Sequence, residues 1–377
     1  MKNNDNYNRV IMNFDEFKEE IKNVDANSTW IPKIDSSVLT LKSFEEIESP
    51  EIAQECNVSL ESAIDTSNNT GFVLKYGKNS YLVRDTALDS VLETAKIKGA
   101  ALTRMPQYLF AEVLNKCFTV AKGDSLLLLR GEKVCACLSD LYEIMPISKL
   151  VDITEKALND KFGNLKFVSA ENNYTYTSAL WELPEAQDDL LEAYDKCVQK
   201  HTKRLHGKNF MPAIRFISSD VGKYAATAIP LFKMNGTYFR INSGIKVAHK
   251  LGTGNKVGIE NYEKEIDTIF SKFIDMEKTM GAMSNCYIEH PVNAMIGFCK
   301  KAGIGKRIAT DAVEEIERFS NGSGCYMDDI YLSIAGVMSA AQQKGMSSMQ
   351  LLDLEENIAK ILYYKWKDFD VAGTITW

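Results

Sequence analysis

The chain lacks the features that mark membrane and secreted proteins. Its uninterrupted apolar runs are far shorter than the ~20 residues that span a bilayer. Its first residues, MKNNDNYNRVIMNFDEF, have no apolar core of the kind found in secretory signals. Hydrophobic residues make up 45% and charged residues 25% of the 377 positions, which is ordinary for a globular protein with a large core. We therefore expect a cytoplasmic protein without membrane contact, with two or three domains at roughly 150 residues each.

Cysteine spacing excludes the usual disulfide and zinc scaffolds. Eight cysteines are scattered along the chain, and no two of them form a CxxC pair. Cys135 and Cys137 alternate in a strand-like run, so both side chains are expected on one face of a strand. Two thiolates on one face are able to seed a metal site, but a pair of small buried side chains in a reducing compartment is the favoured interpretation. We therefore expect neither a metal nor another cofactor.

The motifs of common catalytic sites are also missing. There is no GxSxG and no local Cys/His signature. The run KAGIGKRI departs from a phosphate-binding loop, because Lys300 stands at the first glycine position and Arg307 replaces Ser/Thr. The adjacent carboxylates Asp328-Asp329 and Glu355-Glu356 suit Mg²⁺ in a nuclease. Neighbouring residues on a helix point about 100° apart, so one member of each pair is expected to face inward and one outward. No catalytic residue is assigned, and the sequence leans away from an enzyme.

Acidic residues are almost absent from one segment of this otherwise acidic chain. Between Lys196 and Lys256 there are twelve Lys or Arg and one acid, Asp220, which gives 61 residues a formal charge of +11. The whole chain carries −7, so the other 316 residues carry −18. Clustered cations replace the counterions of a phosphate backbone, and such a block is the expected footprint of a polyanion site.

Composition and periodicity divide the chain into three parts. Residues 1–70 are acidic and polar, and are expected to be partly disordered or to drape over the rest. Residues 71–258 predict an α+β domain that contains the basic region 196–256, with hairpins around Gly77 and Gly131 and a helix over 148–160. Residues 259–377 read as helices only, the first over 260–280. Because strands and helices segregate instead of alternating as βαβ units, the predicted class is α+β. We expect an antiparallel sheet segment with flanking helices, followed by an all-helical C-terminal part.

The basic region combines the end of a helix with three strand-like runs. Pro184 opens the helix, and the runs cover residues 213–219, 224–234 and 237–242. Asn235-Gly236 between the last two runs is a strong hairpin signal.

Aromatic and cationic residues interleave along these runs, a combination that suits single-stranded nucleic acid better than duplex. Cations neutralise phosphates, and aromatic rings stack on unpaired bases. Arg215 and Phe216 point to opposite faces of their strand, so either one is able to lie in the core. A half-buried sheet whose outer face happens to be basic is the alternative. The expected phosphate contacts are Lys200, Lys203, Arg204, Lys208, Arg215, Lys223, Lys233, Arg240, Lys246 and Lys250, and the expected stacking residues are Tyr224, Tyr238 and Phe239.

From about Tyr81 onward the order of motifs is similar to that of a known family. The runs YLVRDTALDSVLETA, RMPQYLFAEVLNKCF and SLLLLRGEKVCACLSDLYEIMPISKLVDITEKAL follow one another, the last with a Leu-Ser-Asp-x-Tyr match at Leu138–Tyr142. Downstream, Ser218-Ser219-Asp220 stands where the family has Asn-Ser-Glu, and Lys233-Met234 replaces a cysteine before Asn-Gly. The last helices, from CYMDDIYLSIAGVMSAAQQ to Leu354-Glu355, complete a resemblance to domain-of-unknown-function family 932 over about residues 81–370.

The resemblance implies a protein of phages, prophages or plasmids in a bacterial cytoplasm, with no catalytic residues to carry over. Our main hypothesis is a non-enzymatic nucleic-acid-binding protein that acts on single-stranded DNA in replication or recombination, annealing included. One alternative is an interaction protein that inhibits a host factor, such as a defence complex, through its basic face. The other is a metal-dependent nuclease. The sequence leaves open whether the partner is DNA or RNA, and whether the protein forms oligomers.

Overall fold

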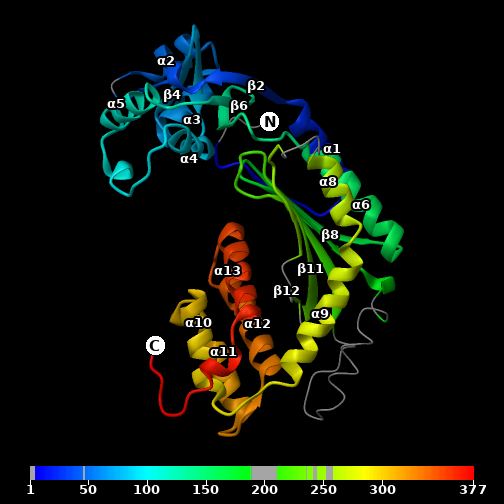
Figure 1. The fold of residues 1–377 in the computed structure, drawn as a ribbon. Coiled ribbons are helices and arrows are strands. Elements are labelled where there is room, and N and C mark those ends of the chain that lie inside the picture. Colours follow the sequence, from blue (N-terminus) through cyan, green and yellow to red (C-terminus); the bar gives the residue numbers. More distant parts are fainter. Residues whose placement is uncertain are drawn as a thin grey trace.

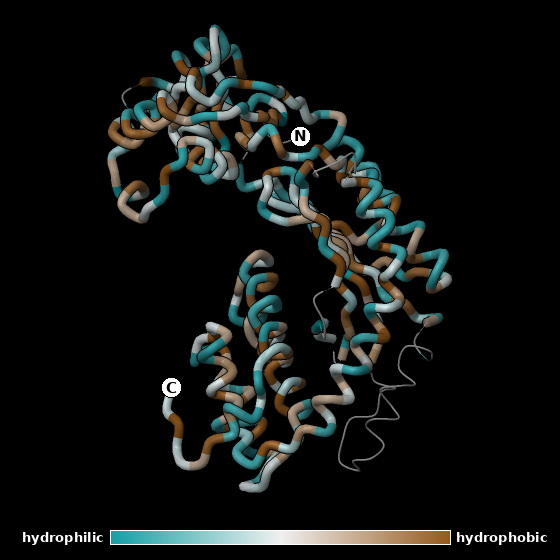
Figure 2. Tube along the Cα trace, in the orientation of Figure 1, coloured by the Kyte–Doolittle hydropathy of each residue, from teal (hydrophilic) through white to brown (hydrophobic). Residues whose placement is uncertain are grey.

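The structure is a computed structural model that describes residues 5–45, 47–186, 188, 210–234, 236–240, 244–251 and 258–377. The chain forms a crescent with a six-stranded sheet and its helices at one end, a seven-stranded sheet in the middle and a group of helices at the other end (Figure 1). Apolar stretches recur along the strands and helices of all three parts, interrupted by hydrophilic residues (Figure 2). The seven-stranded sheet and the C-terminal helices share one apolar core, whereas the six-stranded sheet has cores of its own on its two faces.

Helices cover both faces of the six-stranded sheet. Its strand order is β2-β6-β7-β5-β4-β3, and only the β5–β7 pair is parallel. Helices α4 (Asp85–Thr94) and α5 (Gln107–Phe118) pack on one face, and α2 (Ser49–Cys56) and α3 (Leu60–Asn69) lie on the other side. The strands are β2 (Ser28–Asp35), β3 (Thr40–Ser43), β4 (Phe72–Tyr76), β5 (Asn79–Val83), β6 (Asp124–Arg130) and β7 (Lys133–Ser139).

Strand alternation explains how both faces of this sheet are buried. Leu74 and Val83 pack with α4 and α5, while their chain neighbours Val73 and Leu82 pack on the side of α2. Successive side chains of a strand point to opposite faces, so a continuous apolar run fits a sheet covered on both sides. The two hairpins expected from the sequence, β4–β5 and β6–β7, are both present.

A β-bulge in β7 overturns the prediction that Cys135 and Cys137 share one face. The register shifts between Leu128 and Leu129 on β6, because Leu128 pairs with Ala136 and Leu129 with Val134. Cys135 is the extra residue, and such an insertion reverses the alternation of side chains beyond it. Cys137 consequently packs with Val134 under α4 and α5, whereas Cys135 packs on the opposite side with Leu128. The two thiols do not face one another.

The seven-stranded sheet is antiparallel throughout, with the order β1-β8-β9-β10-β11-β12 and β13 paired to β11. Its apolar face packs against α1 (Phe14–Ala26), α6 (Ile147–Phe162), α8 (Gly258–Ile266) and α9 (Ile269–Ser284). Its strands are β1 (Asn8–Ile11), β8 (Lys166–Asn173), β9 (Thr177–Glu182), β10 (Met211–Ser218), β11 (Ala226–Met234), β12 (Thr237–Arg240) and β13 (Ile245–Val247).

Four helices form the C-terminal end of the crescent, and two of them contact the seven-stranded sheet. These helices are α10 (Pro291–Ala302), α11 (Lys306–Ser320), α12 (Met327–Gln343) and α13 (Ser348–Lys360), and both α12 and α13 touch β12. A two-stranded sheet joins β14 (Tyr287–Ile288) to β15 (Cys325–Tyr326). Short 3₁₀ turns occur at Ser36–Val38, Leu102–Arg104, Pro184–Ala186, Ile361–Tyr363 and Trp366–Phe369.

The predicted class, α+β with an antiparallel sheet, flanking helices and a helical C-terminal part, is confirmed. The expectation for residues 1–70 is wrong for the described residues, because β1 belongs to the seven-stranded sheet and β2 and β3 to the six-stranded one. Residues 71–258 share their strands between the two sheets. The C-terminal part also holds the β14–β15 pair, so it is not helices only.

None of the described helices combines the length and the apolar character needed to cross a membrane.

Candidate nucleic-acid interface

The structure describes part of the predicted interface. Lys200, Lys203, Arg204 and Lys208 lie outside the described residues, as does Asn235 of the predicted hairpin. The other candidates lie on or beside β10 to β13.

Most of these candidates share the face of the seven-stranded sheet that points away from α6, α8 and α9. Lys233 pairs across the strands with Tyr238, Arg240 with Leu231, and Lys246 with Thr227. Arg215 lies on this same face, while Phe216 is fully buried on the other. The sequence left the choice between these two open, and the helices on the far side of the sheet decide it.

Phe239 is a correction to the predicted stacking set. Its side chain is 2% exposed and packs in the core, 5.9 Å from the ring of Phe210 and 6.4 Å from that of Phe232. The strand turns Phe239 away from the face that carries Tyr238 and Arg240. A ring in this position cannot stack on a base.

Arg215 and Arg240 converge on one carboxylate from the C-terminal helices. Arg215 donates to Glu355 Oε2 of α13, and Arg240 Nε lies 3.4 Å from Glu355 Oε1. The Glu355 side chain is 2% exposed, and the two arginine side chains are 15% and 11% exposed. Both guanidinium groups therefore already have an anionic partner on α13 within the protein.

Lys233 and Tyr238 are held by a second buried carboxylate. Glu182 Oε1 accepts from Lys233 Nζ at 2.7 Å and from the Tyr238 hydroxyl at 2.8 Å, while Lys166 Nζ lies 2.8 Å from Oε2. Burial alone raises the pKa of the Glu182 carboxyl, but these three hydrogen bonds outweigh it and bring the pKa down to about 2. Lys233 thus already has an anionic partner.

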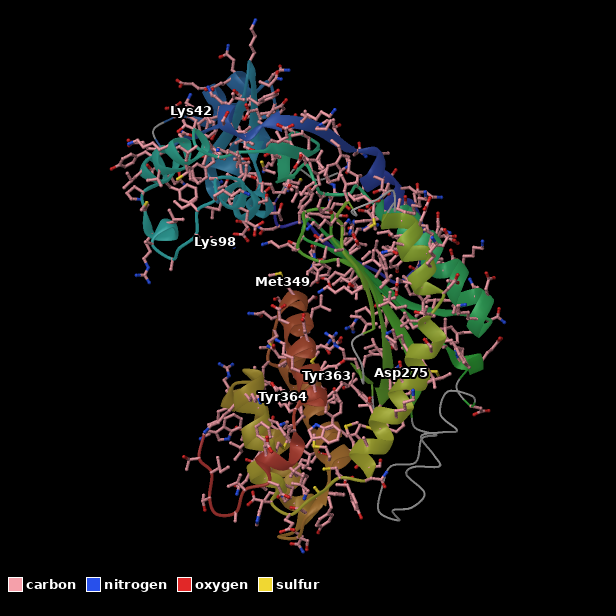
Figure 3. All side chains as sticks on the ribbon, viewed as in Figure 1. Lys42, Lys98, Asp275, Met349, Tyr363 and Tyr364 are labelled. Atoms are coloured by element: carbon pink, nitrogen blue, oxygen red, sulfur yellow. The ribbon has the colours of Figure 1, made fainter. Side chains whose placement is uncertain are left out.

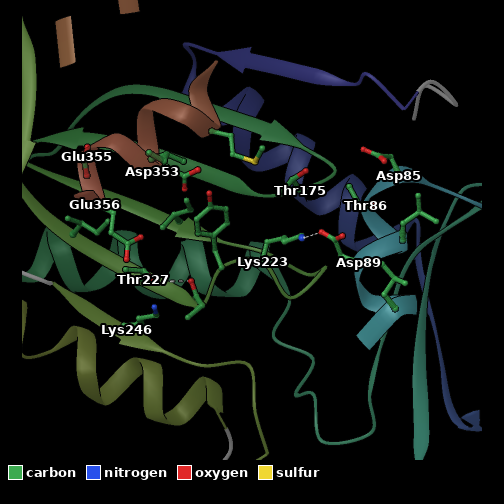
Figure 4. Close-up of a pocket in the computed structure, with 18 of the residues that line it drawn as sticks. Asp85, Thr86, Asp89, Thr175, Lys223, Thr227, Lys246, Asp353, Glu355 and Glu356 are labelled. Atoms are coloured by element: carbon green, nitrogen blue, oxygen red, sulfur yellow. Dashed lines mark hydrogen bonds and ion pairs between the residues drawn. The ribbon is translucent and has the colours of Figure 1, made fainter. Parts of the chain in front are cut away.

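Lys223 and Tyr224 lie where the sheet meets the six-stranded end of the crescent. Lys223 Nζ forms an ion pair with Asp89 of α4 (Figure 4). Tyr224 is half-buried, and its ring meets that of Tyr176 edge-on at 5.6 Å.

Among the described cations of the basic region, Lys246 and Lys250 form no ion pair with a described carboxylate. Both side chains are exposed, and neither forms an ion pair with any residue that the structure describes. The described part of the basic region therefore presents two unpaired cations out of six.

A buried serine–histidine pair lies just before Lys250. His249 Nε2 and Ser218 Oγ are 3.0 Å apart, and the ring of His249 stacks on Tyr142 at 5.2 Å. Ser218 is fully buried, so its hydroxyl is out of reach of a substrate. Burial lowers the pKa of the His249 imidazole to about 4. Serine–histidine pairs also occur in hydrolases, but this buried pair stabilises the fold and is not placed for catalysis.

A cleft of about 1000 Å³ opens on this face of the sheet, between α4 and α13. Figure 4 shows Asp353, Glu355 and Glu356 of α13 on one side and Asp85 and Asp89 of α4 on the other, with Lys223 reaching Asp89 and Lys246 below Glu356. None of these carboxylates belongs to the interface that the sequence predicts. For α4, the sequence does contain a sign of this acidic wall: Asp85, Asp89 and Glu93 are spaced four residues apart, which places three acids on one helix face.

The paired carboxylates at 328–329 and 355–356 do not assemble into one site. Glu355 is buried against the two arginines while Glu356 is exposed, as expected for neighbours on a helix. Asp328 Oδ2 accepts from Ser284 Oγ at 2.8 Å. Within the described ranges, no three Asp, Glu, His or Cys side chains group as metal ligands.

No protein-family model, curated protein or solved structure matches the chain. The resemblance to domain-of-unknown-function family 932 therefore stays a prediction from the motifs.

Proposed function

We propose that this protein is a non-enzymatic nucleic-acid-binding protein of a phage, prophage or plasmid that binds single-stranded DNA in replication or recombination. One observation carries the proposal: a +11 segment of 61 residues within a chain whose net charge is −7. Such a segment favours a polyanion because each phosphate contact releases a condensed counterion.

The cations of this segment fall into paired and unpaired groups, and the proposed phosphate contacts exclude the paired ones. Lys246 and Lys250 supply unpaired positive charge, whereas Arg215, Lys223, Lys233 and Arg240 are neutralised within the protein. Six further cations of the segment lie outside the described residues: Lys196, Lys200, Lys203, Arg204, Lys208 and Lys256. Together these eight side chains are the proposed phosphate contacts.

A titration with single-stranded and duplex DNA and RNA at two salt concentrations tests the proposal. Six to ten phosphate contacts predict a loss of roughly 10³- to 10⁵-fold in affinity between 50 and 200 mM salt. The double variant Lys246→Gln/Lys250→Gln is expected to lower the slope of log K against log salt by about 1.4 on a single strand. Its matched control is Lys22→Gln/Lys306→Gln, because both of those lysines are exposed and form no ion pair with a described residue.

The outcomes separate the possibilities clearly. Binding that ignores salt, or no binding to any of the four nucleic acids, contradicts the proposal. Equal affinity for single strand and duplex contradicts the single-strand preference alone.

A second candidate is a protein that inhibits a host factor through its basic face. The observation in its favour is that four of the six described cations of the basic region already pair with carboxylates of this chain. This leaves less free positive charge for a phosphate backbone than the sequence indicates. A stoichiometric host protein that stays bound after nuclease treatment, combined with salt-independent behaviour towards DNA, favours this candidate.

A further inference from the structure

A second hollow adjoins the cleft between α4 and α13. The first holds about 1000 Å³ and the second about 530 Å³, and both are lined by Tyr224 and Ala225. Small-molecule sites occupy roughly 300–1,000 Å³. The two hollows meet at Tyr224, and their combined volume exceeds this range. They therefore suit an extended peptide segment better than a small molecule.

Apolar side chains from all three parts of the crescent line the first hollow. They come from α4 and the turn after it, from β10 and β11, and from α13. Met349, in the first turn of α13, lies on the inner side of the crescent (Figure 3). The apolar lining includes Leu88, Leu92, Leu102, Ile217, Ile229, Met349 and Leu352. Burial of these surfaces favours a ligand with apolar side chains of its own.

Carboxylates line the two helical walls. Asp85, Asp89 and Glu93 recur every four residues, so they occupy one face of α4. All three line one hollow or the other. On the opposite wall, Asp353 and Glu356 lie three residues apart on α13.

Four of these five acids have no cationic partner among the described residues. Asp89 pairs with Lys223, whereas Asp85, Glu93, Asp353 and Glu356 form no ion pair with a described residue. Burial raises the pKa of the Tyr224 phenol, and the charges of Asp353 and Glu356 raise it further. The two carboxylates of α13 therefore act directly on the ring that separates the hollows.

The cations that line the cleft do not cancel the negative charge of the two helical walls. Lys223 and Arg240 are matched by Asp89 and Glu355. Lys246, Lys250 and Lys360 remain, on β13, after it and at the last residue of α13. A phosphate backbone placed between α4 and α13 meets unpaired carboxylates on both sides, and like charges repel it. A lysine or arginine at the same place gains two carboxylates and the face of an aromatic ring.

We propose that this cleft binds a protein segment in which apolar residues are combined with Lys or Arg. The segment lies across Tyr224, with its cations towards Asp353 and Glu356 on one side and Asp85 and Glu93 on the other. This site adjoins the nucleic-acid surface proposed above, because Lys246 and Lys250 line the same two hollows, but it uses the acidic walls and not those lysines.

Fluorescence anisotropy with the full-length chain tests the proposal. The probe is a labelled peptide in which leucines alternate with lysines, and its counterpart replaces every lysine by glutamate. The variant Asp353→Asn/Glu356→Gln removes two exposed charges at nearly constant shape. The matched control, Glu260→Gln/Glu263→Gln, removes the same charges three residues apart from α8, on the far side of the sheet.

The lysine peptide is expected to bind the parent and the α8 control equally, and the α13 variant about tenfold more weakly, which corresponds to roughly 1.4 kcal/mol. The glutamate peptide is expected not to bind. Three results overturn the proposal: no binding of the lysine peptide, equal binding by both double variants, or equal binding of both peptides. A gain in single-stranded DNA affinity in the α13 variant beyond that of the α8 control also overturns it, because the strand and not a peptide then occupies the cleft. The three peptide results do not depend on whether Lys246 and Lys250 contact DNA.

Discussion

Arg215 of β10 donates to the carboxylate of Glu355 on α13, a residue 140 positions later in the chain. The pair lies on the face of the sheet opposite α6, α8 and α9, and Arg240 of β12 approaches the same carboxylate. A cation that the sequence assigned to phosphate binding thus connects the central sheet to the C-terminal helices.

Removal of the Glu355 charge is expected to destabilise the protein strongly. Glu355→Gln leaves two nearly buried guanidinium groups without a counter-charge, and loss of one partner of a buried pair costs about 3–5 kcal/mol. The neighbouring Glu356→Gln is exposed, so a change within about 0.5 kcal/mol is expected. Urea unfolding of the two variants measures the difference. Equal stability of both variants contradicts a structural role for the Arg215–Glu355 contact.

Two ion pairs join the six-stranded end to the seven-stranded sheet, and they are expected to contribute unequally. Arg130 and Asp220 are both nearly buried, at 4% and 6% exposure, and Arg130 Nε also donates to Ser28 at 2.8 Å. Asp220→Asn is expected to cost about 3–5 kcal/mol. Lys223 and Asp89 are exposed, so Lys223→Gln is expected to cost at most about 1 kcal/mol. Thermal or urea unfolding ranks them, and a larger loss for Lys223→Gln is the contrary result.

Acidification is expected to weaken the fold through His249. The unfolded imidazole takes up a proton near pH 6.5, whereas burial holds the folded pKa at about 4. The unfolded state therefore binds more protons between these values, and stability falls as the pH drops through this window. The loss amounts to about 2 kcal/mol between pH 7 and pH 5 for this group.

The variant His249→Gln isolates this effect, because its amide is still able to hydrogen-bond Ser218. Urea midpoints measured at pH 7 and pH 5 are expected to differ less in the variant than in the parent. The carbon-13 shifts of the imidazole give an independent measure, and a ring that is protonated in the folded protein at pH 6 disproves the prediction.

The four cations at 200–208 are expected to contribute more to nucleic-acid affinity than the paired lysine Lys233 of the sheet. Substitution of Lys200, Lys203, Arg204 and Lys208 by glutamine removes up to four phosphate contacts and lowers the salt slope on single-stranded DNA by about 2.8. Lys233→Gln serves as the comparison, since Glu182 already neutralises that lysine. Its affinity for DNA is expected to stay within twofold of the parent, on the order of 0.4 kcal/mol. An equal loss per charge in the two variants contradicts the idea that pairing with Glu182 removes Lys233 from phosphate binding.

Local patterns predicted much of the secondary structure. The apolar runs around Gly77 and Gly131 form the expected hairpins, and the helix expected at 148–160 is α6. Hairpins and amphipathic helices depend on residues within a few positions of one another, which is why periodicity detects them. Periodicity did not detect the break in the helix expected at 260–280. The chain turns at Asp267-Thr268, where α8 ends and α9 begins.

The sequence predicted which residue types make up the candidate site, but not which side chains they pair with. The sequence alone determined that a positive segment interleaved with aromatic residues forms strands, because charge and alternation are properties of neighbours. Only the tertiary structure decided which of those side chains are free, since Glu182, Glu355 and Asp89 reach their cations from distant elements. It also decided that Phe239 belongs to the core and that Lys246 and Lys250 stay exposed. An ion pair depends on which chain segments meet, and charge counted along one segment carries no information about the carboxylates that fold against it.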